Sequence, residues 1–194
     1  MMVEKNNQDD TIPKGYTRVT AVLETFTNFD SILPHVLENA TERGSVIHEF
    51  CEYHALNLFV DEPPEKCKFY IESFKKWFDE MVVKILCTEK RVNHDKYLVS
   101  GQFDLICQLK GDASGTWTIL DYKSPQVKSK TWQIQTAAYM LLAEEILNIK
   151  ISRRMALMLD NEGKKAKCVE YTDHENDKKL FLSALSLHKF FTKK

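Results

Sequence analysis

The chain has 194 residues, of which 43% are hydrophobic and 28% are charged, and its formal net charge is −1. This balance is that of an ordinary globular protein, and the length fits a full hydrophobic core. The near-neutral charge argues against a general polyanion binder, although a basic groove can coexist with an acidic centre. Because no apolar run approaches the ~20 residues that a membrane helix needs, we expect no membrane contact.

The N-terminus and the cysteines favour a reduced, cytoplasmic protein. The first ten residues are polar and acidic, unlike a signal or transit peptide. We expect residues 1–14 to be a disordered tail and residues 15–194 to form one domain. The cysteines are dispersed and contain no C-x-x-C pair, which predicts neither a disulfide framework nor a zinc site; they are Cys51, Cys67, Cys87, Cys107 and Cys168.

The first half of the chain is predicted to be mainly helical. A weak helical pattern covers about residues 30–39, and a better helix follows Arg43-Gly44 with Ser45 as its N-cap. After the break at Pro63-Pro64, a further helix is expected over about residues 65–84. Its large apolar residues recur at helical spacing, which favours core packing over a cofactor site.

The hydrophobic period then changes to that of strands. Residues 85–92, 97–109 and 117–124 are predicted to form an antiparallel meander, because turn residues join them. A helix is expected over about residues 129–147, strands over 153–159 and 166–171, and a last helix from about residue 173. The stripe expected to be buried on that helix is Leu180, Ala184, Leu187 and Phe191. This order predicts an α/β fold, with a central mixed sheet flanked by helices.

Two aspartates lie on neighbouring predicted strands. Asp104 is expected on a polar face, because the odd-numbered residues between positions 99 and 109 form an apolar face. Asp121 and Lys123 share one face of the next strand, and Tyr122 points away. Carboxylates on adjacent strands can bind Mg²⁺ or Mn²⁺ and direct a water molecule. The alternative is that each aspartate sits at a strand end or pairs with a lysine.

Other polar side chains could support such a site. Lys123 could position the attacking water and offset charge on a phosphate, or could be an ordinary surface lysine. His48 could be a Mn²⁺ ligand, with Glu52, one helical turn further on, as a candidate partner. The alternative is an ordinary surface or core residue, which a histidine inside a helix more often is. Gln135 and Tyr139 share the expected buried side of their helix, where a glutamine needs a partner. They could equally be ordinary polar residues near a helix end.

The order of these motifs resembles the PD-(D/E)XK nuclease superfamily. The resemblance is greatest to its RecB-type branch, which includes phage exonucleases and the mitochondrial genome maintenance exonuclease. It spans about residues 15–145 and implies a restriction-endonuclease-like core. The motifs that carry it are Gly44-x-x-x-His48, Gly101-Gln102-Phe103-Asp104, Asp121-Tyr122-Lys123 and Gln135-x-x-x-Tyr139.

This resemblance implies a Mg²⁺- or Mn²⁺-dependent deoxyribonuclease that hydrolyses phosphodiester bonds with activated water. Lys123 would be the catalytic lysine, and Gln135 and Tyr139 would organise the site and contact DNA. Glu89 matches an acidic residue often found on the first strand of the core. The implied metal ligands are His48, Asp104, Asp121 and the backbone carbonyl of Tyr122.

The implied partner is DNA with single-stranded or double-stranded ends, in replication, recombination, repair or phage DNA metabolism. The expected location is the cytoplasm of a bacterial or phage-infected cell. No helicase motif is present, so a helicase or recombination partner would be a separate protein. Relatives with an iron–sulfur cluster carry three clustered C-terminal cysteines; only Cys168 lies in that region, so no cluster is expected. The sequence makes no prediction of the oligomeric state.

Positive charge around the predicted site suggests DNA contacts, although a charge run is more often only a solvated face. Trp132 could stack on a base or pack in the core. The candidate contacts are Arg43, Lys128, Lys130, Trp132, Arg153 and Arg154. A short chain has no spare domain for reading sequence, which favours an exonuclease over a site-specific endonuclease. The alternative function is a nuclease-fold protein that binds nucleic acid or a protein partner without cutting.

Overall fold

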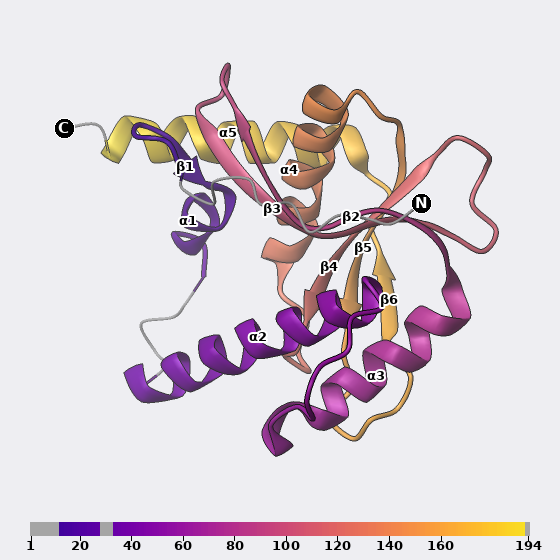
Figure 1. Cartoon of the computed structure of the whole chain (residues 1–194). Helices are drawn as coiled ribbons and strands as arrows, with labels where there is room; N and C mark the ends of the chain where they lie inside the picture. Colours follow the sequence, from indigo (N-terminus) through magenta and orange to yellow (C-terminus); the bar gives the residue numbers. More distant parts are fainter. Residues whose placement is uncertain (1–11, 28–32, 193–194) are drawn as a thin grey trace.

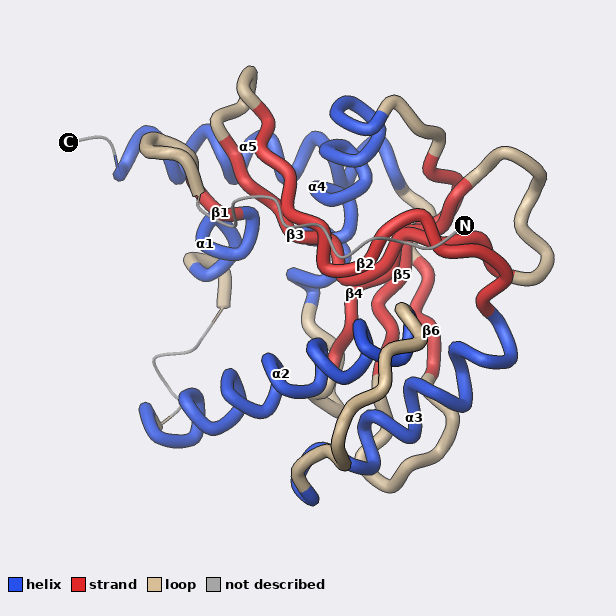
Figure 2. Tube along the Cα trace, in the orientation of Figure 1, coloured by secondary structure: helices blue, strands red, loops and turns tan. Residues whose placement is uncertain are grey.

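The computed structural model describes residues 12–27 and 33–192, and the predicted tail lies mostly outside these ranges. Helices and strands follow one another much as the sequence predicts (Figures 1 and 2). The strands are β1 (Thr17–Arg18), β2 (Val82–His94), β3 (Val99–Leu109), β4 (Trp117–Lys123), β5 (Ile151–Met158) and β6 (Lys167–Glu170). The helices are α1 (Val19–Glu24), α2 (Pro34–Ala55), α3 (Glu65–Met81), α4 (Lys130–Leu147) and α5 (His174–Thr192).

Within the described residues, six strands form one mixed sheet. β3 is antiparallel to β2 and to β4, β4 is parallel to β5, and β5 is antiparallel to β6. α2 and α3 cover one face of this sheet, whereas α1, α4 and α5 cover the other (Figure 1). The predicted α/β architecture is therefore confirmed. Over the described residues, no helix is long and apolar enough to cross a membrane.

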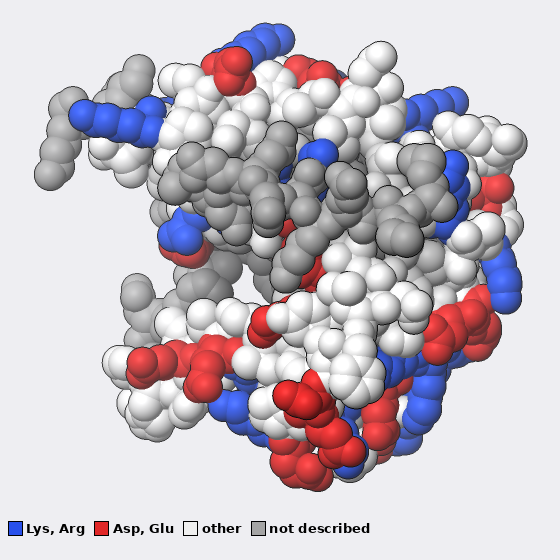
Figure 3. All heavy atoms as spheres, viewed as in Figure 1, with Lys and Arg blue, Asp and Glu red and all other residues white. Residues whose placement is uncertain are grey.

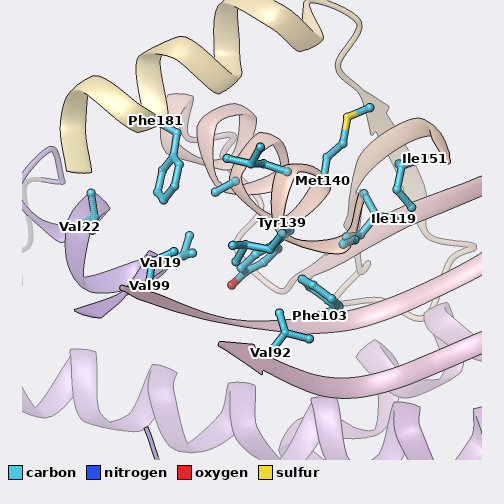
Figure 4. Packing of buried hydrophobic residues seen from close by; sticks show 14 of the residues in the cluster. Val19, Val22, Val92, Val99, Phe103, Ile119, Tyr139, Met140, Ile151 and Phe181 are labelled. Atoms are coloured by element: carbon cyan, nitrogen blue, oxygen red, sulfur yellow. The ribbon is translucent and has the colours of Figure 1, made fainter. Parts of the chain in front are cut away.

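Each face of the sheet has its own hydrophobic core. Under α4 and α5, Phe103 of β3 packs edge-on against Tyr139, near Phe181 of α5 (Figure 4). Under α3, Phe74 contacts the ring of Tyr122 in the same way. Because full burial of one such side chain stabilises a fold by roughly 1.5–3 kcal/mol, both helical layers are firmly held to the sheet.

The helix that carries His48 is longer than predicted. α2 has 22 residues and continues through Gly44 and Ser45, so the predicted helix start at Ser45 is wrong. Pro34 occupies the first turn, where its missing N–H costs nothing. Ser45 Oγ instead donates to the carbonyl of Thr41 over 3.2 Å, a bond compatible with a helix interior.

The predicted alternation of β3 changes phase at Asp104. Val99 and Phe103 belong to the core under α4, but Leu105 and Cys107 belong to the core under α2 and α3. The prediction that all these residues share one face is therefore wrong. The neighbouring strand changes over the same stretch: β1 pairs with the start of β3, and β4 pairs only from Leu105 onward.

The last helix buries a different stripe from the predicted one. Of the predicted residues only Ala184 is buried, whereas Leu180, Leu187 and Phe191 are 48%, 55% and 79% exposed. The helix instead packs through Phe181 against the core under α4. Apolar residues occur all around this helix, so its sequence does not determine which side faces the sheet.

We predict opposite effects on stability for alanine at two glycines. An added Cβ at Gly101 would lie 2.7 Å from Leu142 Cδ1 and 3.3 Å from the Tyr139 ring. Gly101→Ala should lower the free energy of unfolding by about 1–3 kcal/mol, because the core must shift to accept it.

The matched control is Gly44→Ala, within α2, where an added Cβ meets no atom within 4 Å. This change should raise the free energy of unfolding by about 0.5–1 kcal/mol, because alanine favours a helix interior. Urea unfolding measures both values. Equal effects of the two substitutions would contradict the close packing of α4 on β3.

Candidate active site

The predicted aspartates meet where β3 and β4 separate. The last paired residues of these strands are Leu105 and Leu120, so one further step of the register places Asp104 opposite Asp121. Beyond this point Asp104 Oδ2 accepts a hydrogen bond from the backbone N–H of Tyr122 over 2.6 Å. The Asp104 carboxylate thus takes the place of a backbone acceptor for this N–H, where the pairing of β3 with β4 ends. The two aspartates line a fork in the sheet, and both are buried.

Glu89 adds a third carboxylate beside the two aspartates, on the neighbouring strand β2. In the β2–β3 register it lies between Thr88 and Lys90, which puts it opposite Asp104. Glu89 has φ of +44°, a left-handed conformation that is uncommon outside glycine. Carboxylates therefore occupy neighbouring positions on β2, β3 and β4.

His48 reaches the fork from α2. Its Nδ1 lies 3.2 Å from Glu89 Oε1 and 3.5 Å from Asp104 Oδ1. The ligand atoms of these three residues all lie within 4.8 Å of one another, a geometry that could hold a metal ion. The sequence placed Glu89 outside the ligand set, whereas the structure brings it into this cluster. The role of Asp121 as a ligand stays a prediction, because in the structure it faces Lys123 and Gln135.

A polar network from α4 supports the β4 side of the fork. Lys123 forms an ion pair with Asp121, and its Nζ donates to Gln135 Oε1 over 2.9 Å. Gln135 Nε2 donates to Asp121 Oδ1 over 3.1 Å and to the Tyr139 hydroxyl over 3.0 Å. The amide of Gln135 therefore fixes both charged groups. The predicted grouping of these four residues is present in the structure.

Trp132 lies beneath the lysine rather than on the surface. It is 6% exposed, and Lys123 Nζ lies 5.7 Å from its ring centroid, a cation–π distance. This burial fits the core-packing alternative for Trp132 and leaves its ring unavailable for stacking on a base. Its position instead restricts the movement of Lys123.

The charged groups of the fork perturb one another. Burial, together with the charge of Asp104, raises the pKa of Asp121 to about 6, although Lys123 acts in the opposite direction. Burial alone would lower the pKa of His48, but the carboxylates of Asp104 and Glu89 outweigh it, and that pKa lies well above its ordinary value. The cluster therefore favours a cation at its centre.

The donor set fits a divalent metal. Two carboxylates and one imidazole are ligands that Mn²⁺ accepts readily, and carboxylates suit Mg²⁺. Asp121 Oδ2 is buried and, among the described residues, receives no hydrogen bond of good geometry, although it lies beside Lys123 Nζ.

The predicted DNA contacts are not brought together. Arg154 is completely buried and paired with Asp177, so its prediction as a DNA contact is wrong. Arg153 is paired with Asp112 and Glu170. Two adjacent arginines in the sequence do not reveal that one is buried and that both are paired, because their acidic partners lie far away in the sequence.

Three basic candidates remain. Lys128 is exposed just before α4, Lys130 is exposed at the first position of α4, and Arg43 lies over the Tyr70 ring. On the face shown in Figure 3, acidic and basic side chains of the described residues are interspersed over α2 and α3. The structure therefore leaves the DNA contacts of Lys128, Lys130 and Arg43 as predictions.

Two assigned roles also stay predictions. Glu52 is half-buried on α2, and His48 is in contact with the carboxylates of Glu89 and Asp104. Tyr122 turns its side chain away from Asp121, as predicted, toward His48 and Phe74 on the opposite face. Its backbone N–H is used by Asp104, and its carbonyl remains a candidate ligand.

The sequence matches the family model of the PD-(D/E)XK nuclease superfamily over residues 17–187. The chain belongs to this superfamily, as the order of its motifs predicts; its assignment to the RecB-type branch stays a prediction. Comparison with curated proteins gives no match.

Solved structures share the fold at low sequence identity. A candidate exonuclease from Eubacterium rectale has a TM-score of 0.56 and 12% identity, over 92% of this chain and 80% of that chain. LHK-Exo in complex with dAMP has a TM-score of 0.34 and 12% identity, over 91% of each chain.

The raised pKa of Asp121 predicts that the stability of the metal-free protein depends on pH. Between its ordinary pKa of 3.8 and about 6, the folded state binds a proton that the unfolded state releases. Stability should therefore fall as the pH rises through this window, relative to Asp121→Asn, which cannot titrate. Urea unfolding with a chelator at pH 4 to 7 measures this difference.

Asp61→Asn provides the control, because Asp61 is exposed in the loop before α3. The stability of the Asp61→Asn variant relative to wild type should not change over the same pH range. If the difference between wild type and Asp121→Asn were also constant with pH, the buried, proton-binding state of Asp121 would be wrong.

Proposed function

We propose that this protein is a metal-dependent DNA nuclease that hydrolyses phosphodiester bonds, and that it acts from DNA ends as an exonuclease. The observation that carries the proposal is the fork itself. Glu89, Asp104 and Asp121 occupy neighbouring positions on three strands, with His48 beside Glu89 and Asp104 and with Lys123 beside Asp121. Membership of the PD-(D/E)XK superfamily supports this chemistry.

The protein would bind Mg²⁺ or Mn²⁺ through His48, Glu89 and Asp104, with Asp121 and the carbonyl of Tyr122 as further candidate ligands. When bound, such an ion lowers the pKa of a water molecule and polarises the phosphoryl oxygen. The bond from the Tyr122 N–H holds Asp104 in place for this task. Because the two carboxylates of the cluster are close in space, a divalent cation also relieves their mutual repulsion.

Lys123 would act on the substrate. Its Nζ is held by Asp121, by Gln135 and by the Trp132 ring, so it lies in one place at the edge of the cluster. A fixed ammonium can hold the attacking water and offset the negative charge that develops on the phosphate. Gln135, itself bonded to Tyr139, keeps the lysine directed at this position.

The preference for DNA ends is the finer part of the proposal. The similar fold of the candidate exonuclease from Eubacterium rectale supports the same preference. A separate helicase or recombination protein would then supply any unwinding.

We predict that Lys123→Met abolishes DNA cleavage while the fold stays intact. Loss of the ammonium should lower the rate by about 100-fold or more. Asp104→Asn should have a similar effect, because it removes a ligand. The assay is digestion of end-labelled single-stranded, double-stranded and closed circular DNA with Mg²⁺ or Mn²⁺.

Lys179→Met, at an exposed position of α5, is the matched control and should cleave like wild type. Resistant circles would support action from ends, whereas their degradation would overturn the exonuclease assignment. Wild type that leaves every substrate intact with either metal would instead favour a protein that binds without cutting. Equal rates for Lys123→Met and wild type would contradict the role of the lysine.

A further inference from the structure

A glutamine on β3 links the metal-site cluster to an arginine outside it. Gln102 lies opposite Arg91 of β2 in the strand register. Its Oε1 accepts a hydrogen bond from Arg91 Nη2, and its Nε2 donates to Glu89 Oε2 over 2.8 Å. Since arginine only donates and a carboxylate only accepts, these contacts fix which way the amide points.

Because Gln102 binds Oε2 of Glu89, the other carboxylate oxygen, Oε1, is the one that lies in the metal-site cluster. Glu89 Oε1 lies 3.2 Å from His48 Nδ1, whereas Oε2 is occupied by the amide. The backbone of Glu89 is also in the left-handed region, which costs energy for a residue with a side chain. Such a conformation persists only where its surroundings hold it.

We propose that Gln102 is a positioning residue of the metal site. It holds Glu89 with Oε1 directed at His48 and Asp104, and Arg91 anchors the amide that does so. This inference rests on the proposed function, because it concerns metal binding at the same fork. It adds a residue that touches neither the metal nor the substrate.

The physical reason is repulsion between neighbouring carboxylates. Glu89 and Asp104 present oxygens within the same 4.8 Å cluster, so a metal-free Glu89 gains by turning toward water. Its side chain has several rotatable bonds, and ordering it on metal binding would reduce the affinity. A charge-assisted hydrogen bond from Gln102 keeps the carboxylate in the binding position beforehand.

Calorimetric titration of Mn²⁺ into the full-length protein tests this proposal. Gln102→Met keeps the length of the side chain but removes the amide. It should weaken Mn²⁺ binding about tenfold or more, the usual effect of losing a partner of a metal ligand.

Gln108→Met is the matched control. Gln108 lies on the same strand, is also half-buried, and donates to the Thr116 carbonyl over 3.2 Å, a contact outside the cluster. Its Mn²⁺ affinity should equal that of wild type. Equal weakening by both substitutions would show a general effect on β3 and would overturn the proposal.

A double-mutant cycle tests whether Gln102 acts through Glu89. Glu89→Gln should weaken Mn²⁺ binding, and adding Gln102→Met to it should have little further effect. Fully additive losses would overturn the proposal. Should Gln102→Met not fold, Gln102→Asn replaces it, because the shorter amide cannot reach both Arg91 and Glu89.

The outcomes also separate this inference from the proposed function. Wild type that binds no Mn²⁺ would reject the metal site and this inference with it. Wild type that binds Mn²⁺, with Gln102→Met binding equally well, would reject the inference alone.

Discussion

Beyond Leu105 and Leu120, the ladder between β3 and β4 stops, and the Asp104 carboxylate becomes the acceptor for the backbone N–H of Tyr122. This one bond keeps the separating strands from leaving an unsatisfied N–H in the interior. It also commits one oxygen of Asp104 to the backbone and leaves the other for His48. The opening that results can be reached from both helical layers of the protein.

The α4 side of this opening is fixed by a second buried group. Arg154 donates to the Gln133 carbonyl and Thr136 of α4, and to His174, the Asp173 carbonyl and Asp177 at the start of α5. A buried ion pair alone is weak support for stability, but here every N–H direction of the guanidinium has an acceptor. The first turns of α4 are thereby tied to α5, and Gln135 reaches Asp121 from a helix that cannot easily shift.

Local sequence patterns predict much of this arrangement, because strand period and turn residues are local properties. The meander, and the shared face of Asp121 and Lys123, follow from them. Glu89 itself has a left-handed backbone, and its place opposite Asp104 depends on the exact register of β2 with β3, which the strand period does not contain. Ser45 locally resembles a helix start, but packing of α2 against α3 overrides that preference. Burial of Arg154 depends on Asp177, 23 positions away.

The fork holds like charges together in the protein interior, and this arrangement opposes folding. Burial and Asp104 raise the pKa of Asp121 in spite of Lys123, so its ionised form is disfavoured in the metal-free state. The bonds from Gln102, Gln135 and the Tyr122 N–H do not remove this repulsion; they prevent the carboxylates from escaping it. A cation that binds the folded state alone would recover the lost stability. The electrostatic repulsion within this cluster and the affinity for a metal that we propose for it would therefore have one origin.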